Sequence, residues 1–561
     1  MKNWTKLDKE DDKWKQYNKS IGSEGPGKVD VVVWDLDNGD IQVVLFKNDY
    51  GYHITKEGSD QSRVDIKSGV FAGLDTKEEA EKLAMMPGAT KTKTWKLKAD
   101  YVRDFGWTSS RRYIADAMAV KVGENDVMAV SIYAPEGNPL WEQWSTRAVA
   151  QTLKSFSRMT FDYPYHKAIS VHAKNQGMEY PMICWNYGRP EPDGSYSDRV
   201  KFGMISVIIH EIGHNYFPMI VNSDERQWTW MDEGINTYLQ FLAEQRWEPD
   251  YPSWRGDARN IVTYMASDNQ MPIMTNSENI IGFGNNAYAK AATGLNILRE
   301  TIMGRELFDF AFKQYAKRWA FKHPTPDDLF RTLEDASAVD IDWFIKGWYF
   351  TIDNTDIALD DVQWYKLNTQ NPDVEYPVAE AAYNDDRKNV AVEKNKEEGM
   401  SYYVERDERL QDFYYSYDRF EVTEEARNAY RRFSATLTDE EKAMLGDDKN
   451  FYQLEFSNKG GLVMPIIIEW TFADGTKEVD RIPAYIWRKN EEKVTKAFMK
   501  DKEVVQILID PDRETADTDV SNNYWPRQSQ PTRFEMFKRR GGGARGQSSG
   551  SNPMQRANGG N

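Results

Sequence analysis

The alternation of apolar and polar positions predicts β structure near the start of the chain. Residues 29–46 are apolar on both sides of Asn38-Gly39, which is a strong type I′ hairpin signal. We therefore expect residues 1–137 to form a mainly β N-terminal part. Three further segments show periodicity, strand-like at 93–103 and 112–133 and helical at 75–86.

From residue 140 to about 350 the pattern becomes helical and rich in aromatic residues. Ile235, Tyr238, Leu239 and Leu242 repeat at helical spacing, so they should bury one face of a helix. We expect residues 138–350 to form one domain.

The C-terminal third predicts a polar connector followed by a second β region. Residues 366–412 are rich in charged residues and Asn, and a helical stretch covers 423–446, so we expect a connector with a charged loop and helices over 351–449. Asp474-Gly475 lies between two strand-like segments, which predicts a hairpin within a small immunoglobulin-like β-sandwich at 450–526. Residues 527–561 are rich in Gly, Ser, Gln and Arg and should be a disordered, solvated tail.

Composition narrows the function classes. The 561 residues are 40% hydrophobic and 29% charged, which fits several folded domains with sizeable cores. The net charge of -17 argues against nucleic acid as a partner. A single cysteine, Cys184, excludes an intramolecular disulfide and a cysteine-based zinc knuckle. No apolar run approaches the roughly 20 residues that a transmembrane helix needs.

The start of the chain leaves two localisations open. Residues 1–8 contain no apolar segment of the kind that a signal peptide requires. The sequence therefore predicts either a cytoplasmic protein that is complete or an exported, periplasmic or secreted, protein whose N-terminus is truncated here.

The strongest chemical signal is His210-Glu211-Ile212-Gly213-His214. On a helix, positions i and i+4 share a face, so His210 and His214 can offer two imidazole nitrogens to one metal ion. A catalytic zinc needs three protein ligands and an open position for water, and Glu233 is placed to be the third ligand. Glu211, beside the first ligand, is the candidate general base.

A structural role for the two histidines is the simpler alternative. A lone histidine on a helix is usually a core or surface residue, but these two flank a carboxylate inside the apolar run 207–212. Burying such a group costs several kcal/mol unless its members are paired or bound to metal. Asn215 and the residues after it do not provide the third histidine of a metzincin, so the pattern indicates a gluzincin, in which a glutamate on a second helix completes the site.

Three separated motifs resemble those of the aminopeptidase N family of zinc metallopeptidases, which also contains epoxide hydrolases. The zinc motif is the first. Gly177-Met178-Glu179-Tyr180-Pro181 resembles the exopeptidase signature Gly-x-Met-Glu-Asn, and Tyr288-Ala289-Lys290 resembles the family's Tyr-x-Lys-Gly. The resemblance implies a thermolysin-like α+β catalytic domain in a multidomain α+β protein that binds one zinc ion per chain.

The resemblance also implies roles for individual residues. Glu179 would pair with the free α-ammonium of a peptide, and Gly177 and Met178 would lay extended backbone along the substrate. Tyr288 would donate its hydroxyl to the oxyanion of the tetrahedral intermediate. The substrates would be peptides with a free N-terminus.

Three features depart from the family pattern. Tyr180 replaces the usual Asn, and Ala291 replaces the usual Gly. Residues 1–95 do not resemble the N-terminal β-domain that supplies a second anchor for the substrate amine, so the sequence does not identify that anchor.

The sequence thus predicts a zinc-dependent aminopeptidase. Two alternatives stay open, namely a zinc endopeptidase or epoxide-type hydrolase, and a catalytically silent peptide-binding protein. The intact Glu211 favours an enzyme, because a degenerate site commonly loses its base. Neither the oligomeric state nor the preferred first residue follows from these motifs.

Overall fold

The computed structural model describes six segments of the chain, namely residues 4–6, 31–35, 42–48, 51–56, 94–446 and 449–527. Three predictions lie outside them: the turn at Asn38-Gly39, the helix at 75–86 and the tail from residue 528 onward.

An eight-stranded sheet forms the base of the N-terminal half, with its strands in sequence order from β1 to β8. The first six pair antiparallel with their neighbours, and β7 and β8 are added in parallel. The strands predicted in 29–46 and 112–133 are confirmed as the antiparallel pairs β2–β3 and β5–β6. The bounds are β1 Trp4–Lys6, β2 Val31–Asp35, β3 Gln42–Asn48, β4 Gly51–Lys56, β5 Ile114–Val122, β6 Asn125–Tyr133, β7 Lys167–His172 and β8 Ile183–Asn186.

The sheet corrects the domain boundary predicted after residue 137. β6 pairs in parallel with β7, from Met128↔Lys167 to Ile132↔Val171, so one sheet continues across that boundary. Parallel neighbours need a crossover connection, and the helix α3 (Leu140–Met159) supplies it. The short strands β7 and β8 were missed inside the segment predicted as helical.

The strand predicted at 93–103 is also wrong, since residues 94–103 contain no strand. Trp95 and Tyr101 are 62% and 85% exposed. Their aromatic side chains produced a strand-like pattern without a sheet surface to cover.

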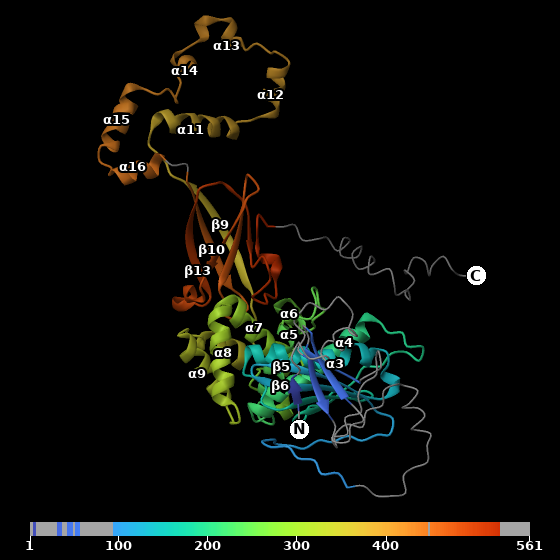
Figure 1. Ribbon diagram of the computed structural model, residues 1–561. Helices are drawn as coiled ribbons and strands as arrows, with labels where there is room; N and C mark the ends of the chain where they lie inside the picture. The colour runs from blue at the N-terminus through green and yellow to red at the C-terminus, as the bar shows by residue number, and fades with distance from the viewer. Residues whose placement is uncertain are drawn as a thin grey trace, which may run out of the picture.

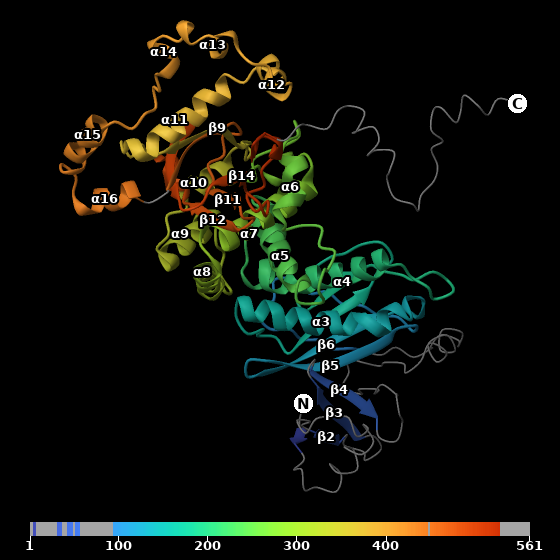
Figure 2. The same cartoon turned by 90° about the horizontal axis from the view of Figure 1, so that it is seen from above.

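The helical body lies on and beyond this sheet. Helix α3 contacts β5, β6 and β7, and α4 contacts β7 and β8, so both cover one face of the sheet (Figure 2). Within the described residues, no helix is both long and apolar enough to cross a membrane. The remaining bounds are η1 Pro135–Gly137, α4 Asp198–Gly213, η2 Asn215–Ile220, α5 Thr229–Glu244, α6 Ala258–Met265, η3 Ser277–Asn279, η4 Gly284–Lys290, α7 Ala291–Ile297, η5 Leu298–Ile302, α8 Arg305–Trp319, α9 Pro326–Ser337, α10 Asp342–Ile345 and η6 Lys346–Phe350.

Two helices carry the predicted metal ligands, and both are fixed by local sequence and by packing. Ser197 caps the N-terminus of α4 by accepting a hydrogen bond from the backbone N–H of Val200, which satisfies a donor that the helix leaves free. Helix α5 packs against α3, α4, η4 and α7. Its predicted apolar face is confirmed, because Ile235, Tyr238, Leu239 and Leu242 are all buried.

Two antiparallel sheets form the C-terminal region. The ring of Tyr452 on β10 lies 6.0 Å from that of Trp470 on β11, so the sheets contact each other through core side chains. The hairpin around Asp474-Gly475 is confirmed as β11–β12. The sheets have the orders β13–β10–β9 and β12–β11–β14–β15, with bounds β9 Ile357–Lys366, β10 Asn450–Asn458, β11 Ile466–Phe472, β12 Lys477–Ile482, β13 Lys493–Lys500, β14 Val504–Ile509 and β15 Tyr524–Trp525, beside the short helices η8 Ala484–Lys489 and η9 Val520–Asn522.

The predicted connector over 351–449 needs one correction. Strand β9 lies inside that range but pairs antiparallel with β10, so it belongs to the C-terminal sheet. The helices between these two strands extend beyond the sheets as an arm in Figure 1. They are α11 Pro372–Asp386, α12 Val390–Glu397, α13 Tyr403–Arg406, η7 Glu408–Leu410, α14 Phe413–Ser416, α15 Glu424–Ser434 and α16 Asp439–Gly446.

Two glycines of α4 should respond to alanine in opposite ways. A Cβ on Gly213 would lie 2.5 Å from the Phe156 ring of α3 and 2.3 Å from Asn236 Oδ1 of α5, whereas a Cβ on Gly203 meets nothing within 4 Å. We expect Gly213→Ala to lower the free energy of unfolding by about 1–3 kcal/mol through overpacking. Gly203→Ala should raise it by about 0.5–1 kcal/mol. Denaturant unfolding of both variants tests this, and equal effects would contradict the close packing of α4.

Candidate active site

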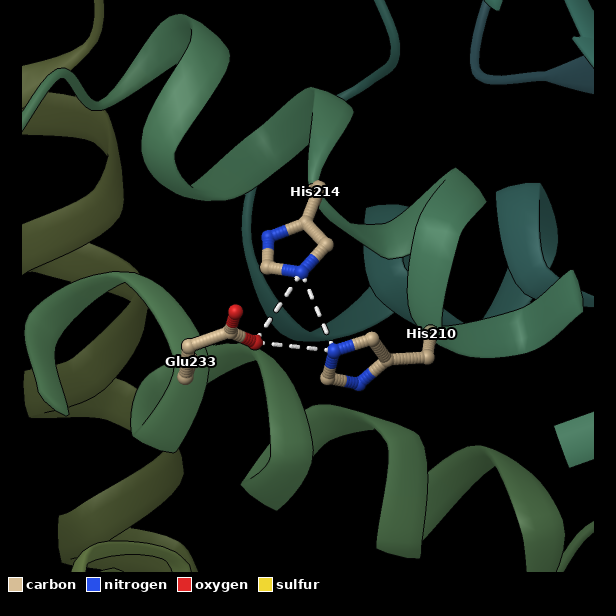
Figure 3. A group of neighbouring side chains, drawn as sticks. All are labelled: His210, His214 and Glu233. Carbon is tan, nitrogen blue, oxygen red and sulfur yellow. Dashed lines mark hydrogen bonds and ion pairs between the residues drawn. The ribbon is translucent and has the colours of Figure 1, made fainter. Parts of the chain in front are cut away.

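Helices α4 and α5 bring the three predicted metal ligands together. His210 Nε2 lies 3.0 Å from His214 Nε2 and 2.9 Å from Glu233 Oε2, and His214 Nε2 lies 3.3 Å from the same oxygen. Figure 3 shows the three side chains pointing toward one another. Both histidines are buried. The spacing of the ligands in the sequence therefore corresponds to one compact group of donor atoms.

The other nitrogen of each ring is held by a hydrogen-bond acceptor. His210 Nδ1 lies 2.9 Å from Gln240 Oε1, and His214 Nδ1 lies 2.9 Å from both the Phe217 carbonyl oxygen and Asp232 Oδ1. Each Nδ1 therefore donates its hydrogen outward, and each Nε2 turns its lone pair toward the centre. Two lone pairs and a carboxylate oxygen facing one another repel unless a cation lies between them.

The spacing suits zinc. Ligands about 2.0–2.1 Å from a tetrahedral zinc ion lie about 3.3 Å from each other, close to the separations in this group. Two imidazoles and one carboxylate are also the ligand types of a catalytic zinc site that keeps one position open. The residues present therefore fit a zinc ion.

The charges around His214 also favour a cation. Burial alone would lower the pKa of His214, but the carboxylates of Asp232 and Glu233 outweigh burial and raise that pKa well above its ordinary value. Burial tends to raise the pKa of Glu233, and the two histidines outweigh burial and lower it. The centre thus has a negative potential that attracts positive charge.

Glu211 lies beside this centre with one oxygen unpaired. Its side chain is 6% exposed, and Oε2 has no hydrogen-bond partner. Burial, and then the nearby Glu179 and Glu233, raise the pKa of Glu211 to about 8 against the opposing charge of His214. A carboxylate with a pKa near neutrality can both take and return a proton at neutral pH.

Gly177 leaves the space that Glu211 occupies. A Cβ on Gly177 would lie 2.3 Å from Glu211 Oε1 and 2.8 Å from Val207 Cγ2. Its neighbour Met178 pairs with Trp185 through two backbone hydrogen bonds, with N···O distances of 3.0 and 2.8 Å. This segment therefore extends β structure beside β8 and places Glu179 next to the centre.

Glu179 contributes a further negative charge. One oxygen of Glu179 lies within 4.8 Å of ligand atoms of Glu211 and His214. Burial raises the pKa of Glu179, and Glu233 and Glu225 raise it further against the charge of His214. Such a carboxylate gains free energy when a cation binds beside it.

Tyr288 reaches the centre from η4. Its ring stacks on that of His210, with centroids 5.7 Å apart, and Arg255 lies 4.3 Å above its ring centroid. Burial, followed by the negative charge of Glu233, raises the pKa of Tyr288. The phenol therefore keeps its proton and can donate a hydrogen bond at neutral pH.

Lys290, two residues later, is fully buried. Its Nζ has no hydrogen-bond partner and lies 5.7 Å from the Trp348 ring centroid. Burial lowers the pKa of Lys290 to about 8, and Asp353 opposes the shift only in part. The lysine of this motif therefore lies in the packing behind Tyr288, at a cost in stability.

The structure brings together all eight residues that the sequence singled out, although their catalytic roles stay predictions. Sequence reasoning missed the residues that hold the histidines and Tyr288. Gln240 lies seven positions after Glu233, two turns along the same helical face, so periodicity could have indicated it. Asp232 lay inside the quoted motif, but its side-chain direction was not predictable, and Arg255 carried no signal at all.

The comparisons with known proteins agree with this geometry. Residues 146–348 match the Peptidase family M1 domain, a range that includes every predicted site residue. The chain is 24% identical over 289 residues to "Aminopeptidase 2, mitochondrial" of Saccharomyces cerevisiae, covering 47% of this chain and 30% of that protein. It is 24% identical over 254 residues to "Alanine/arginine aminopeptidase" of the same yeast, covering 42% and 29%. The matches thus span about 30% of these relatives' lengths.

Solved structures similar to the chain include two bacterial peptidases. Legionella pneumophila aminopeptidase A, in complex with aspartic acid, matches with a TM-score of 0.46 and 10% identity, covering 72% of this chain and 38% of that one. The M1 zinc metallopeptidase of Deinococcus radiodurans matches with a TM-score of 0.33 and 19% identity, covering 40% and 48%.

The buried Lys290 should destabilise the protein in a pH-dependent way. Its pKa falls from 10.5 to about 8 on folding, so the unfolded chain binds more protons between these values. This penalty is complete below about pH 8, at about 3 kcal/mol, and disappears as the pH rises through the unfolded value. We expect Lys290→Met to stabilise the protein at pH 7 and to lose that advantage by about pH 10.5. Denaturant unfolding at several pH values measures the difference, and a pH-independent one would refute it.

Proposed function

Since residues 146–348 form a peptidase family M1 domain, we propose that the protein is a zinc-dependent aminopeptidase that removes single residues from peptide N-termini. The observation that carries this proposal is the buried group of three facing acceptors on His210, His214 and Glu233, with Glu211 unpaired beside it. The names of the yeast relatives support the same activity.

The proposed cofactor is one zinc ion per chain. His210, His214 and Glu233 would hold it, and Gln240 and Asp232 would fix the orientation of the two imidazole rings. When bound, zinc lowers the pKa of water and polarises the substrate carbonyl.

The protein's own groups then carry the proton transfers. Glu211 takes a proton from the attacking water and returns it to the leaving amine, which its pKa of about 8 permits at neutral pH. Tyr288 donates its phenolic hydrogen to the developing oxyanion. Glu179 pairs with the α-ammonium of the substrate, so the bond that reaches Glu211 is the one after the first residue.

The domain arrangement supports the same assignment. We assign residues 138–350 to a thermolysin-like catalytic domain whose sheet also contains β5 and β6. The two C-terminal sheets correspond to the immunoglobulin-like sandwich, with β9 included. The arm of helices between β9 and β10 would be an insertion that leaves the site unchanged.

Two other functions make different predictions. An endopeptidase or an epoxide-type hydrolase would not need a free amine, so N-acetylated peptides or epoxides would be its better substrates. A silent peptide-binding protein would hold zinc without turnover. The position of Glu179 beside the metal ligands and the unpaired Glu211 favour the aminopeptidase.

Glu211 and the metal should both be required for turnover. We expect the protein to hydrolyse aminoacyl anilides, to lose activity with a chelator and to regain it with zinc. Glu211→Gln keeps the size of the side chain but removes the base, so kcat should fall by about 10²–10⁴-fold while zinc content stays the same. A zinc-loaded Glu211→Gln protein with full activity would rule out this mechanism.

Glu179 should set the preference for a free N-terminus. Because a hydrogen bond to a charged group contributes about 1.5–3 kcal/mol, Glu179→Gln should lower kcat/KM for free peptides by about 10–100-fold. The same peptides with an acetylated N-terminus should be poor substrates of both proteins and should show little change. Equal kcat/KM values for free and acetylated peptides in the wild type would instead favour an endopeptidase.

A further inference from the structure

A second group of carboxylates lies on one side of the metal ligands. One oxygen from each of Glu179, Glu225 and Asp232 lies within 4.8 Å of the other two. Glu225 comes from the loop before α5, and the sequence motifs gave it no role. The three residues therefore place a concentrated negative charge where Glu179 is proposed to meet the substrate.

The separation of these oxygens suits one ammonium group. An ammonium has three N–H donors in tetrahedral directions, so three acceptors at about 2.8 Å from its nitrogen lie about 4.6 Å apart. Within the described part of the chain, neither Glu179 nor Asp232 forms an ion pair with a lysine or arginine. The group therefore has more negative than positive charge until a cation joins it.

Glu225 already binds one organic cation. The guanidinium of Arg103, from the irregular segment before β5, donates to Glu225 Oε1 at 2.6 Å. The carboxylates of Glu225 and Asp232 both raise the pKa of Arg103, against the effect of its burial. A carboxylate has about four acceptor positions, so this single hydrogen bond holds Glu225 in place and leaves capacity for another donor.

Glu225 also faces open space. It lines a hollow of about 460 Å³ together with Arg103, Trp228 and His323. Its side chain is 34% exposed, so a substrate amine can reach it from solvent. Glu225 thus connects the hollow to the carboxylates beside the metal ligands.

We propose that Glu225 is a substrate-positioning residue that completes, with Glu179 and Asp232, a three-carboxylate site for the α-ammonium of the peptide. Arg103 is the positioning residue that orients Glu225. This inference rests on the proposed aminopeptidase function. It supplies from within the chain the second amine anchor that the sequence motifs did not identify.

Kinetics of Glu225→Gln on an aminoacyl anilide test the assignment. The KM should rise roughly tenfold or more, because a charge-assisted hydrogen bond to the ammonium is lost. kcat and zinc content should change less than twofold, since Glu225 contacts neither the metal ligands nor the scissile bond. Glu278→Gln makes the same chemical change on an exposed carboxylate that pairs with Arg226, and its KM should match the wild type.

Two Arg103 variants separate positioning from folding. Arg103→Met should raise KM in the same direction as Glu225→Gln, and the double variant should add little to either single change. Arg103→Lys keeps one charged donor and should restore most of the wild-type KM. Thermal unfolding midpoints equal to that of the wild type would exclude a loss of folding as the cause.

The outcomes distinguish this inference from the function on which it rests. Absence of wild-type turnover rejects both. Full wild-type turnover with an unchanged KM in Glu225→Gln rejects only the role of Glu225. Two zinc ions per wild-type chain, falling to one in Glu225→Gln, would also overturn the inference, because the carboxylates would then be a second metal site.

Discussion

The rest of the site depends on three hydrogen-bond acceptors that face one another in a buried space. Gln240 and Asp232 lie beside the outer ring nitrogens, so the lone pairs of His210 and His214 must point inward toward Glu233. Such an arrangement costs several kcal/mol when no cation offsets it. It persists because α4 and α5 are held together by packing and by the hydrogen bond from Asn236 to the His210 carbonyl oxygen. The apolar core therefore stabilises a polar centre that is unfavourable on its own.

The parts of the site that the sequence predicted are those governed by helical geometry. The i and i+4 spacing of His210 and His214 determines that both rings lie on one face, whatever the helix packs against. The apolar repeat that begins at Ile235 likewise gave the orientation of α5, which turns Glu233 inward. Glu179 was identified through a family motif, because no local periodicity connects it to a helix 31 positions later.

The errors come from contacts between segments distant in the sequence. Strands β7 and β8 are short, and their pairing with β6 is stabilised by the sheet rather than by their own residues, so the region read as helical. Strand β9 was assigned to the connector because its partner, β10, lies more than 80 residues later. Arg103 and Glu225 are 122 positions apart, and no spacing rule relates them. Tertiary pairing determines such features, and propensity does not.

The distribution of charge gives the site a direction. Carboxylates gather on the side of Glu179, whereas the opposite donors, the Tyr288 hydroxyl and the Arg255 guanidinium, come from elements beyond α5. A peptide with a positive N-terminus gains free energy when its amine lies among the carboxylates, and its carbonyl oxygen then lies nearer the hydroxyl. An amide nitrogen in place of that ammonium would leave the carboxylates uncompensated, and buried negative charge without a partner is costly. The same acidity that attracts the metal ion therefore also selects the end of the substrate.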